Sequence, residues 1–397
     1  MKALVTGGAG FIGSHIADRL LSEGYEVRIL DNLELRVHPK GKPGWVPRDA
    51  EFIHADVRDE DALKRALEGV QVVFHQAAYQ DYEHDFSKFF HVNSVSTALI
   101  HEILLASRQK TGAEVEKVIV ASSQAVYGEG QYRCRNSECP KYGEVFRAEA
   151  RAAKQLEQGI WDVLCPACGT PADNVRLREE HHNPYNAYAI SKIAEELAAV
   201  RLGKLHGIPT VALRYSIVQG PRQSLFNQYS GICRIFCLRL LNGLPPIIYE
   251  DGFQKRDYVH IDDVVEANMT VLADRRADYG VFNVGGGNET TVREYAAALT
   301  KMLGMDTAPI IAGEYRVGDN RHSVSDISRL EALGWRPLRG LRQIFQDFLS
   351  WVENNGNVGE YFREADRLMR EHGVVKRSAS VPGKPQVNSS FLSPPHV

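Results

Sequence analysis

The stretch Thr6-Gly7-Gly8-Ala9-Gly10-Phe11-Ile12-Gly13 decides the fold of this chain. It follows a short apolar run at residues 2–6, and apolar residues recur at helical spacing after it. Glycines between a strand and a helix permit a tight turn and let a pyrophosphate approach the backbone N–H groups at the helix N-terminus. The stretch therefore predicts a dinucleotide-binding turn that includes Gly7, Gly10, Phe11, Ile12 and Gly13.

Strand and helix patterns continue to alternate beyond this turn. Strands are predicted at residues 25–30, 52–55, 70–75, 117–121 and 210–215, and helices at 60–67, 93–110 and 188–205. This alternation is typical of a parallel sheet with helices on both faces. The expected fold class is therefore α/β, a doubly wound parallel (Rossmann) sheet with a smaller C-terminal lobe and an inserted module that carries four cysteines.

The alternation breaks after Gly128, and this break sets the expected domain limits. Residues 1–130 and 181–219 are assigned to the dinucleotide-binding domain, and 131–180 to an insertion. The insertion contains an Ala/Glu/Lys/Gln stretch near 147–158, which predicts one surface helix.

The remainder of the chain is expected to form a second lobe and a tail. Residues 220–375 are assigned to a substrate-binding lobe interleaved with the first domain, with short strands at 246–249 and 281–284 and a helix at 293–303. Residues 376–397 contain five Ser, four Pro and no acidic residue, a composition typical of disorder.

The composition indicates an ordinary globular protein with small-molecule partners. The chain has 397 residues, with 47 Lys and Arg against 50 Asp and Glu, so its formal charge is −3. This balance provides no basic surface for nucleic acid or an anionic membrane. No signal peptide is evident, and the most apolar stretch, 231–249, is interrupted by arginines and a proline pair. We therefore expect a cytoplasmic protein that binds neither nucleic acid nor membranes.

Two aspartates at predicted strand ends are candidates for binding the adenosine half of a dinucleotide. Asp31 ends the second strand, about 20 residues after the glycine turn, where an acidic residue binds the ribose hydroxyls. A carboxylate there would repel a 2′-phosphate, so Asp31 favours NAD over NADP. Asp56 follows the third strand and is a candidate partner of the adenine amino group; the alternative is that both aspartates only cap turns. Their neighbours Asn32 and Val57 are included in the predicted cofactor site.

Tyr188 and Lys192 form the candidate acid–base pair. Their spacing of four residues places both side chains on one face of a helix. A phenol titrates near pH 10, and an adjacent ammonium stabilises the phenolate and lowers that value. Tyr185 lacks such a partner, because Ala189 stands four residues after it. Tyr188 is therefore the predicted acid–base residue; the simpler alternative is an exposed aromatic beside a surface lysine.

The run Val120-Ala121-Ser122-Ser123-Gln124-Ala125-Val126-Tyr127-Gly128 follows a predicted strand, so its hydroxyls would lie at the carboxyl edge of the sheet, where ligands bind. Together with the glycine turn, the Tyr188 and Lys192 pair and the motif at 256–263, this run resembles the extended short-chain dehydrogenase/reductase family. Within that family the chain is similar to the nucleotide-sugar epimerases and dehydratases. The resemblance covers about 300 of the 397 residues.

The resemblance assigns further residues to the site. It implies that Ser123 is the catalytic hydroxyl, with Ser122 beside it, and that Lys192 also holds the nicotinamide ribose. Arg256 and Arg316 match positions that bind the substrate diphosphate, a role that suits guanidinium groups. The alternative for Arg256 is an ion pair with a neighbouring Asp257, Asp262 or Asp263. The other expected positions are Gln76, Ala77, Ala78 and Asn93 for the cofactor and Tyr79, Gln124 and Arg222 for the substrate.

The residues after Ser123 discriminate among the reactions of such a site. Related 4,6-dehydratases carry Asp-Glu there, whereas this chain has Gln124-Ala125, which cannot transfer a proton usefully. Epimerisation at C4 of a nucleotide-diphosphate sugar needs only the triad, and the chain resembles the dTDP-rhamnose 4-epimerases and UDP-glucose 4-epimerases. The alternatives are an NAD(P)-dependent 4-ketoreductase and, more remotely, a non-catalytic NAD-binding regulator. Ile217 stands where many relatives have a phosphate-contacting Asn, so substrate anchoring is expected to differ.

Four of the six cysteines lie in the predicted insertion. Cys134-x4-Cys139 and Cys165-x2-Cys168 have spacings close to those of a zinc ribbon, and four thiolates satisfy tetrahedral Zn²⁺. This set predicts a closed structural zinc site, with free or oxidised thiols as the alternative. We expect the insertion to cover the substrate cleft or to build an interface, and the protein to be a homodimer.

Overall fold

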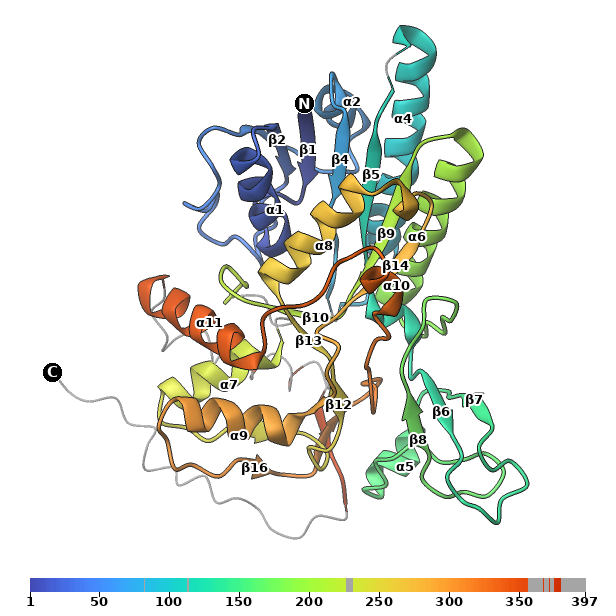
Figure 1. Cartoon of the computed structure of the whole chain (residues 1–397). Helices are drawn as coiled ribbons and strands as arrows, with labels where there is room; N and C mark the ends of the chain where they lie inside the picture. The colour runs from blue at the N-terminus through green and yellow to red at the C-terminus, as the bar shows by residue number, and fades with distance from the viewer. Residues whose placement is uncertain are drawn as a thin grey trace, which may run out of the picture.

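The computed structural model describes residues 1–81, 83–112, 114–225, 231–355, 367, 371 and 375–379. Its centre is a parallel sheet of seven strands in the order β14-β9-β5-β4-β1-β2-β3 (Figure 1). The strands are β1 (Lys2–Thr6), β2 (Glu26–Asp31), β3 (Glu51–His54), β4 (Val72–His75), β5 (Lys117–Ser123), β9 (Thr210–Tyr215) and β14 (Val281–Val284). This strand order is that of a doubly wound α/β sheet, which confirms the predicted fold class.

Two layers of helices bury the sheet. One face carries α1 (Phe11–Ser22) and α8 (Ile261–Ala273), and the other carries α2 (Glu60–Leu67), α4 (Ser96–Thr111) and α6 (Ala187–His206) (Figure 1). Successive side chains of a strand point to opposite faces, so Val5 of β1 joins one apolar core and Leu4 joins the other. Both faces are thus covered, and the carboxyl edge of the sheet is left for ligands.

The turn between β1 and α1 requires glycine at two positions. Gly7 has a φ of +67°, and a Cβ there would stand 2.8 Å from the backbone nitrogen of Ala77. A Cβ on Gly13 would stand 2.3 Å from the carbonyl oxygen of Gly7. The turn therefore packs backbone against backbone, and the N-terminus of α1 faces open space beyond it.

The segment that follows residue 220 is interleaved between the C-terminal lobe and the dinucleotide-binding domain. β14 pairs in parallel with β9, where Val281 lies opposite Ala212, and α8 packs against α1. Residues 261–284 therefore complete the dinucleotide-binding domain. A four-residue apolar strand carries no sign of which sheet it joins, so only the tertiary structure could place it.

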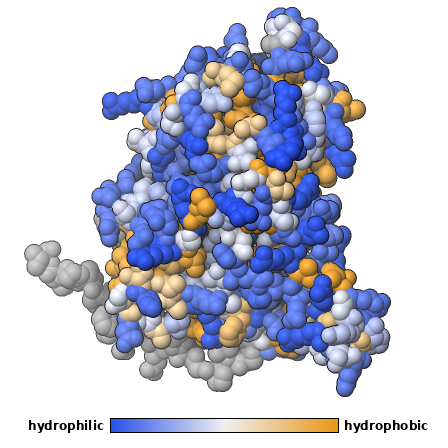
Figure 2. Space-filling model, in the orientation of Figure 1, coloured by the Kyte–Doolittle hydropathy of each residue, from blue (hydrophilic) through white to orange (hydrophobic). Residues whose placement is uncertain are grey.

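The C-terminal lobe has an apolar core of its own. Its helices are α7 (Ile232–Leu241), α9 (Val292–Met302) and α11 (Leu341–Asn355), which meet around Tyr295 and Phe345, with ring centroids 4.8 Å apart. Three separate two-stranded sheets lie outside the large sheet: β10 (Ile217–Gln219) with β13 (Tyr258–His260), β12 (Lys255–Arg256) with β15 (Thr290–Thr291), and β11 (Ile247–Ile248) with β16 (Ile310–Ile311). On the face drawn in Figure 2 the surface is mostly hydrophilic, with apolar residues in small groups.

Five short helical segments complete the description of the two domains. They are α3 (Phe86–Phe89), the π-helix η1 (Phe90–Val95), and the turns η2 (Gln124–Tyr127), η3 (Arg275–Ala277) and α10 (Ser328–Glu331). α3, η1 and α4 run on into one another, so the helix predicted at 93–110 begins earlier, at Phe86.

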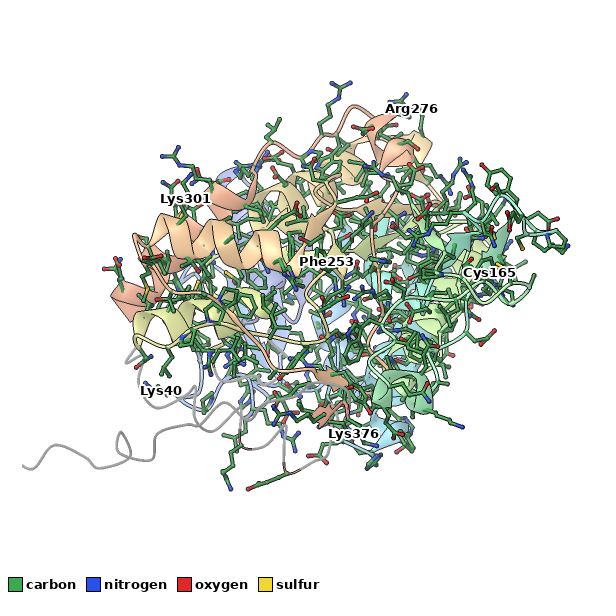
Figure 3. The ribbon with its side chains drawn as sticks, turned by 90° about the horizontal axis from the view of Figure 1, so that it is seen from below. Lys40, Cys165, Phe253, Arg276, Lys301 and Lys376 are labelled. Carbon is green, nitrogen blue, oxygen red and sulfur yellow. The ribbon has the colours of Figure 1, made fainter. Side chains whose placement is uncertain are left out.

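The insertion forms a small antiparallel sheet at one end of the molecule. Its strands are β6 (Gln131–Arg133), β7 (Val145–Arg147) and β8 (Asp173–Val175), with β6 in the middle. The helix expected near 147–158 is wrong in length, since β7 takes up its start and α5 covers only Ala153–Glu157. Seen from below, Cys165 lies at the edge of the molecule, far from α9, which carries Lys301 (Figure 3).

The tail predicted from residue 376 begins too early. β17 (Glu314–Arg316) pairs with β18 (Val375–Arg377), and the backbone nitrogen of Ala379 donates to the carbonyl oxygen of Glu157. Residues 376–379 are therefore part of the fold. The rest of the predicted tail, 380–397, lies outside the described residues.

Candidate active site

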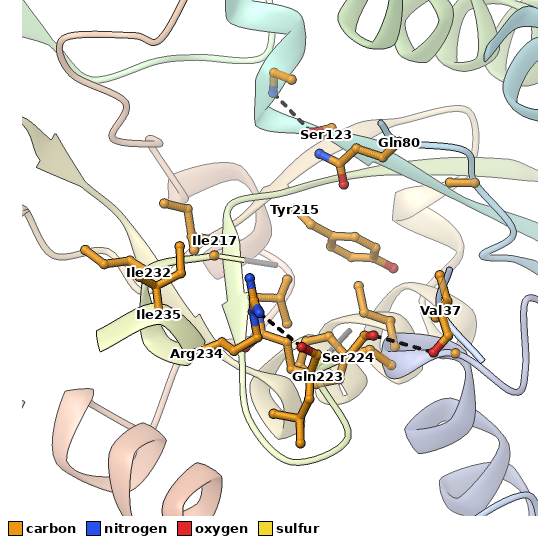
Figure 4. Close-up of a pocket in the computed structure, with 18 of the residues that line it drawn as sticks. Val37, Gln80, Ser123, Tyr215, Ile217, Gln223, Ser224, Ile232, Arg234 and Ile235 are labelled. Atoms are coloured by element: carbon orange, nitrogen blue, oxygen red, sulfur yellow. Dashed lines mark hydrogen bonds between the residues drawn. The ribbon is translucent and has the colours of Figure 1, made fainter. Parts of the chain in front are cut away.

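A cavity of about 850 Å³ lies between the carboxyl edge of the large sheet and the C-terminal lobe. Figure 4 shows part of its lining, where Ser123 and Tyr215 from the sheet face Ile217, Ile232 and Arg234 of the lobe. The predicted site residues that line it are Gly7, Gly10, Phe11, Ile12, Gly13, Gln76, Ala78, Ser122, Ser123, Gln124, Tyr188, Lys192, Arg222, Arg256 and Arg316. The fold thus brings predicted cofactor and substrate residues from widely separated segments to one cavity.

Tyr188 and Ser123 meet at the reacting end of this cavity. Asn186 caps α6, its side chain accepting a hydrogen bond from the Ala189 nitrogen at 2.8 Å, and so fixes where the helix begins. Ser123 ends β5, and its hydroxyl hydrogen-bonds to Tyr188. Burial raises the pKa of Tyr188, while the charge of Lys192 and the Ser123 hydrogen bond act in the opposite direction. The phenol therefore has the two partners that an acid–base tyrosine needs.

Lys192 is held by a carboxylate that the sequence analysis missed. Its ammonium donates to Glu195 Oε2 and to the carbonyl oxygen of Ala121, both at 2.7 Å. Both side chains of the ion pair are buried, and burial raises the pKa of Glu195 to about 7. Glu195 Oε1 is buried and has no hydrogen-bond partner within the described part of the chain. The spacing of three residues after Lys192 on the same helix was the available signal for this pair.

Ser122 lines the cavity, but its hydroxyl is directed at a carboxylate on α6. Its hydroxyl donates to Glu196 Oε2 at 2.7 Å, and Glu196 in turn holds Arg214 with N···O distances of 2.6 and 2.8 Å. Ser122 therefore supports the framework of the site, although it was expected beside the substrate. The strand alternates its side chains, so only one of the two serines can point at the reacting group.

Three further residues predicted for the site lie behind the cavity wall. Asn93 is fully buried and bonds to the backbone of Tyr79 and to the hydroxyl of Ser191. The hydroxyl of Tyr79 donates to Asp85 at 2.8 Å, so this ring packs inside the domain. Ala77 lies against Gly7 and its nitrogen donates to Thr6. These residues position the cavity floor and do not line the cavity.

The adenosine-side residues lie beside the glycine turn. Asp31 accepts hydrogen bonds from the nitrogens of Ala9 at 3.0 Å and Leu33 at 2.8 Å, as the turn-capping alternative foresaw. Partial burial alone would raise the pKa of Asp56, but hydrogen bonds from Arg58 and Asn32 outweigh it and hold this pKa at about 2. Val57 is buried in the apolar core. Asp31, Asn32, Asp56 and Val57 lie outside the cavity lining described above.

Arginines gather on the lobe side of the cavity. Arg256 donates to Asp319 at 3.2 Å and to the carbonyl oxygens of Asn320 and Arg321, so its ion-pair partner is none of the three neighbouring aspartates. Arg316 stacks on the ring of Tyr249. Arg234 of α7 also lines the cavity, and the sequence did not predict this position. An arginine inside an apolar helix indicates only that the apolar stretch is interrupted. These cations make one wall suited to an anion.

The four insertion cysteines form a compact cluster of sulfur atoms. The Sγ atoms of Cys134, Cys139, Cys165 and Cys168 lie within 4.8 Å of one another, and those of Cys134 and Cys168 are 3.8 Å apart. A tetrahedral zinc with Zn–S bonds of about 2.3 Å separates its sulfurs by about 3.8 Å. Hydrogen bonds with Thr170 lower the pKa of the Cys168 thiol to about 6, which favours the thiolate that a metal needs.

Comparison with known proteins gives one consistent family. The NAD dependent epimerase/dehydratase family matches residues 3–158 and 165–285. The dTDP-L-rhamnose 4-epimerase of Burkholderia thailandensis is 32% identical over 359 residues, 88% of this chain and 94% of that protein. Among solved structures, the UDP-glucose 4-epimerase of Thermus thermophilus in complex with NAD aligns with a TM-score of 0.66 and 31% identity, covering 90% of this chain and 100% of that one. The UDP-glucose 4-epimerase of Thermotoga maritima with UDP-glucose aligns with a TM-score of 0.68 and 28% identity, covering 89% and 99%.

The Lys192 and Glu195 pair yields a prediction about the titration of Tyr188. Glu195→Gln removes the negative charge that offsets Lys192, so the phenolate gains stabilisation and the pKa of Tyr188 falls. Among the neighbouring groups, burial lowers the pKa of His75 to about 3, so it stays neutral, and Glu196 remains paired with Arg214. NMR of 13Cζ-labelled tyrosine as a function of pH measures the shift, and Tyr188→Phe assigns the signal. An unchanged or higher pKa would contradict this account of the pair.

Proposed function

Because the chain belongs to the NAD dependent epimerase/dehydratase family, we propose that it is an NAD-dependent 4-epimerase of a nucleotide-diphosphate sugar. The observation that carries this proposal is the meeting of Tyr188, Lys192 and Ser123 at the end of a cavity whose other end is the glycine-rich turn. The named relatives are 4-epimerases of nucleotide sugars, and the two solved structures share the fold.

The residues present fit an NAD molecule. The glycine turn leaves a backbone cradle that a Cβ at Gly7 or Gly13 would fill. Gln76 Nε2 and Arg222 Nη1 line the cavity, are buried, and have no hydrogen-bond partner among the residues that the structure describes. Because buried donors in folded proteins have hydrogen-bond partners, a polar ligand is the expected partner of these two groups. Asp31 beside the turn disfavours a second phosphate on the adenosine ribose, which supports NAD over NADP.

The triad performs both proton transfers of the proposed reaction. NAD, when bound, supplies the acceptor and then the donor of a hydride. Tyr188 as phenolate removes the proton of the sugar 4-hydroxyl, and it returns the proton after the 4-keto sugar has turned its other face. Lys192 stabilises the phenolate, and Ser123 donates a hydrogen bond to the reacting oxygen. Gln124, whose amide oxygen accepts from Ser323 at 3.0 Å, offers no acid for dehydration.

The arginine wall supports a diphosphate as the handle of the substrate. Arg234, Arg256 and Arg316 line the lobe side of the cavity, and burial lowers the pKa of Arg234 to about 10, so it still carries its charge at neutral pH. Ile217 lies on the same wall, and its side chain has no hydrogen-bond donor to offer a phosphate. The cations thus take the anchoring role that the related Asn has in other epimerases.

We also propose that the four cysteines hold a structural zinc ion. The sulfur separations suit a tetrahedral ion, and the cluster lies at the edge of the molecule, away from the cavity, with Cys134, Cys139 and Cys165 buried. Four protein ligands leave no open position for substrate, so the role is structural.

A homodimer through α4 and α6 is the proposed assembly. The helical run from Phe86 to Thr111 is unusually apolar: by length and composition alone it could cross a membrane. Only 44% of its most apolar 18 residues are buried, so apolar side chains remain on the surface. Val95 on this run and Leu197 on the adjacent α6 are 50% and 44% exposed. A second copy of the chain, packed about a two-fold axis, would cover this stripe with the same stripe.

Tyr188→Phe tests the proposed function. Losing the acid–base group lowers kcat for interconversion of a nucleotide sugar by about 10²- to 10⁴-fold, whereas bound NAD is retained. Activity is measured with UDP- and dTDP-sugars without added cofactor, and NAD is released by denaturation and quantified. A wild-type protein without bound dinucleotide and without epimerase activity, or a Tyr188→Phe variant within tenfold of wild type, would overturn the proposal.

Metal analysis tests the zinc site. The purified protein contains about one zinc per chain, and Cys165→Ser lowers this content at least severalfold, because three thiolates bind zinc more weakly than four. Cys233→Ser is the matched control, since Cys233 is buried in α7, away from the cluster, and the zinc content stays unchanged. Well under one zinc per wild-type chain would exclude the site.

Leu197→Glu tests the dimer. A charge placed on this exposed apolar face shifts the mass measured by light scattering from dimer to monomer at micromolar concentration. Leu338→Glu is the control, because Leu338 is 81% exposed and lies between α10 and α11, on neither of the two helices proposed to pair. A monomeric wild-type protein, or a variant that dimerises as wild type does, would contradict this assembly.

A further inference from the structure

Buried charges join the insertion to the wall of the cavity. The side chain of Arg151, which precedes α5, is 2% exposed and pairs with Glu250 at 2.9 Å and Glu129 at 3.4 Å. Its guanidinium also donates to the carbonyl oxygens of Asp319 at 2.7 Å and Trp161 at 2.8 Å. One side chain of the insertion therefore binds Glu129 just after η2, Glu250 in a turn of the lobe, and the segment after β17.

Arg321 completes the same network from the lobe. It is 2% exposed and binds Asp251 at 2.7 Å, Glu250 at 3.0 Å and, in the insertion, Asp162 at 2.8 Å. Its backbone nitrogen donates to Glu129 at 2.6 Å. Glu129 and Glu250 are thus each bound by both arginine residues, and neither buried carboxylate is left unpaired.

The segment fixed by this network, residues 316–321, faces the cavity. Arg316 and Asp319 line the cavity, and Arg256 on the neighbouring wall is bound to Asp319. The hydroxyl of Tyr185, just before the catalytic helix, lies 2.9 Å from the carbonyl oxygen of Gly318 and 2.5 Å from Asn320 Oδ1, and its one proton is shared between these two acceptors. Beyond Arg316 the segment has no strand or helix of its own, so side chains set its position.

The insertion has too small a core to hold Arg151 in place by packing alone. Its buried apolar cluster consists of Tyr132, Ala148, Val163 and Ala172. Phe146 packs against both this cluster and the cysteines, so the two groups form one unit. A module of this size needs a staple such as a metal site. Within its apolar cluster, Ala148 lies three residues before Arg151 and Val163 lies two residues after Trp161.

We propose that the insertion is a metal-stapled clamp on the substrate site: Arg151 is a positioning residue that fixes segment 316–321 for binding the diphosphate of the substrate, and the cysteine cluster fixes Arg151. The inference rests on the proposed function for the identity of the ligand, a nucleoside diphosphate. Arg151 contacts neither the reacting end of the cavity nor the glycine turn, so the clamp governs substrate affinity, while the bound NAD and the chemical step are independent of it.

Direct binding of UDP and dTDP to the zinc-loaded, NAD-loaded protein tests the clamp. Arg151→Met removes the guanidinium group but keeps about the same side-chain volume. The Kd of the nucleoside diphosphate and the KM of the sugar nucleotide are expected to rise tenfold or more. The kcat stays within threefold and the NAD content stays unchanged. A general loss of structure would lower both, so raised Kd and KM with unchanged kcat and NAD content identify a positioning role. Arg135→Met is the matched control, since Arg135 lies in the insertion but is exposed, and it leaves Kd unchanged.

A milder variant and metal removal keep the test decisive if Arg151→Met fails to fold. Asp162→Asn weakens only the outer contact to Arg321 and raises Kd severalfold, and a chelator that strips zinc raises Kd as Arg151→Met does. Wild-type Kd in Asp162→Asn and in the stripped protein would overturn the clamp. A wild-type protein that binds neither UDP nor dTDP would instead overturn the proposed function on which the clamp rests.

Discussion

The ion pair between Glu196 and Arg214 is the contact on which the geometry of the site depends. Glu196 lies on α6, one turn after Lys192, and Arg214 lies on β9 inside the sheet, with both charged groups almost inaccessible to water. Removing one partner of such a buried pair costs about 3–5 kcal/mol, because the other charge is left unpaired. The pair therefore fixes α6 against the sheet, and with it the height of Tyr188 above the end of β5.

Charge is distributed unequally along the cavity, and this separates anchoring from chemistry. At the reacting end the positive charge of Lys192 is balanced by Glu195, so the field at Tyr188 is weaker than that of a lone lysine. On the lobe side burial is the main cause that lowers the pKa of Arg234, and the positive charge of Arg316 adds to the effect. An anion placed between them relieves this repulsion, so the free energy of binding is concentrated away from the bond that reacts.

The fold and the reacting residues could be predicted because local sequence signals specify them. The contacts between segments distant in sequence could not be predicted. The glycine turn, the strand ends and the spacing of Tyr188 and Lys192 each reside in a few adjacent residues, and these define the sheet and one wall of the cavity. The position of β14, the burial of Tyr79 and the orientation of Ser122 depend on partners distant in sequence. Arg234 was missed for the same reason, since a single arginine in an apolar helix has no periodic pattern that reveals what it faces.

The place of the insertion in the chain explains why it bears on the site at all. It lies between the Ser123 loop and the Tyr188 helix, and the chain is drawn together at its base, where the Asn183 nitrogen donates to the carbonyl oxygen of Val126 at 2.8 Å. A loop held closed at its base adds little entropic cost to the fold whatever its length, so about 50 extra residues are tolerated there. Once such a loop is stapled into a rigid module, its outer side chains can reach residues remote in sequence, and Arg151 meets Asp319 across a separation of 168 residues. The dinucleotide-binding domain and the C-terminal lobe are then joined by the insertion as a third body.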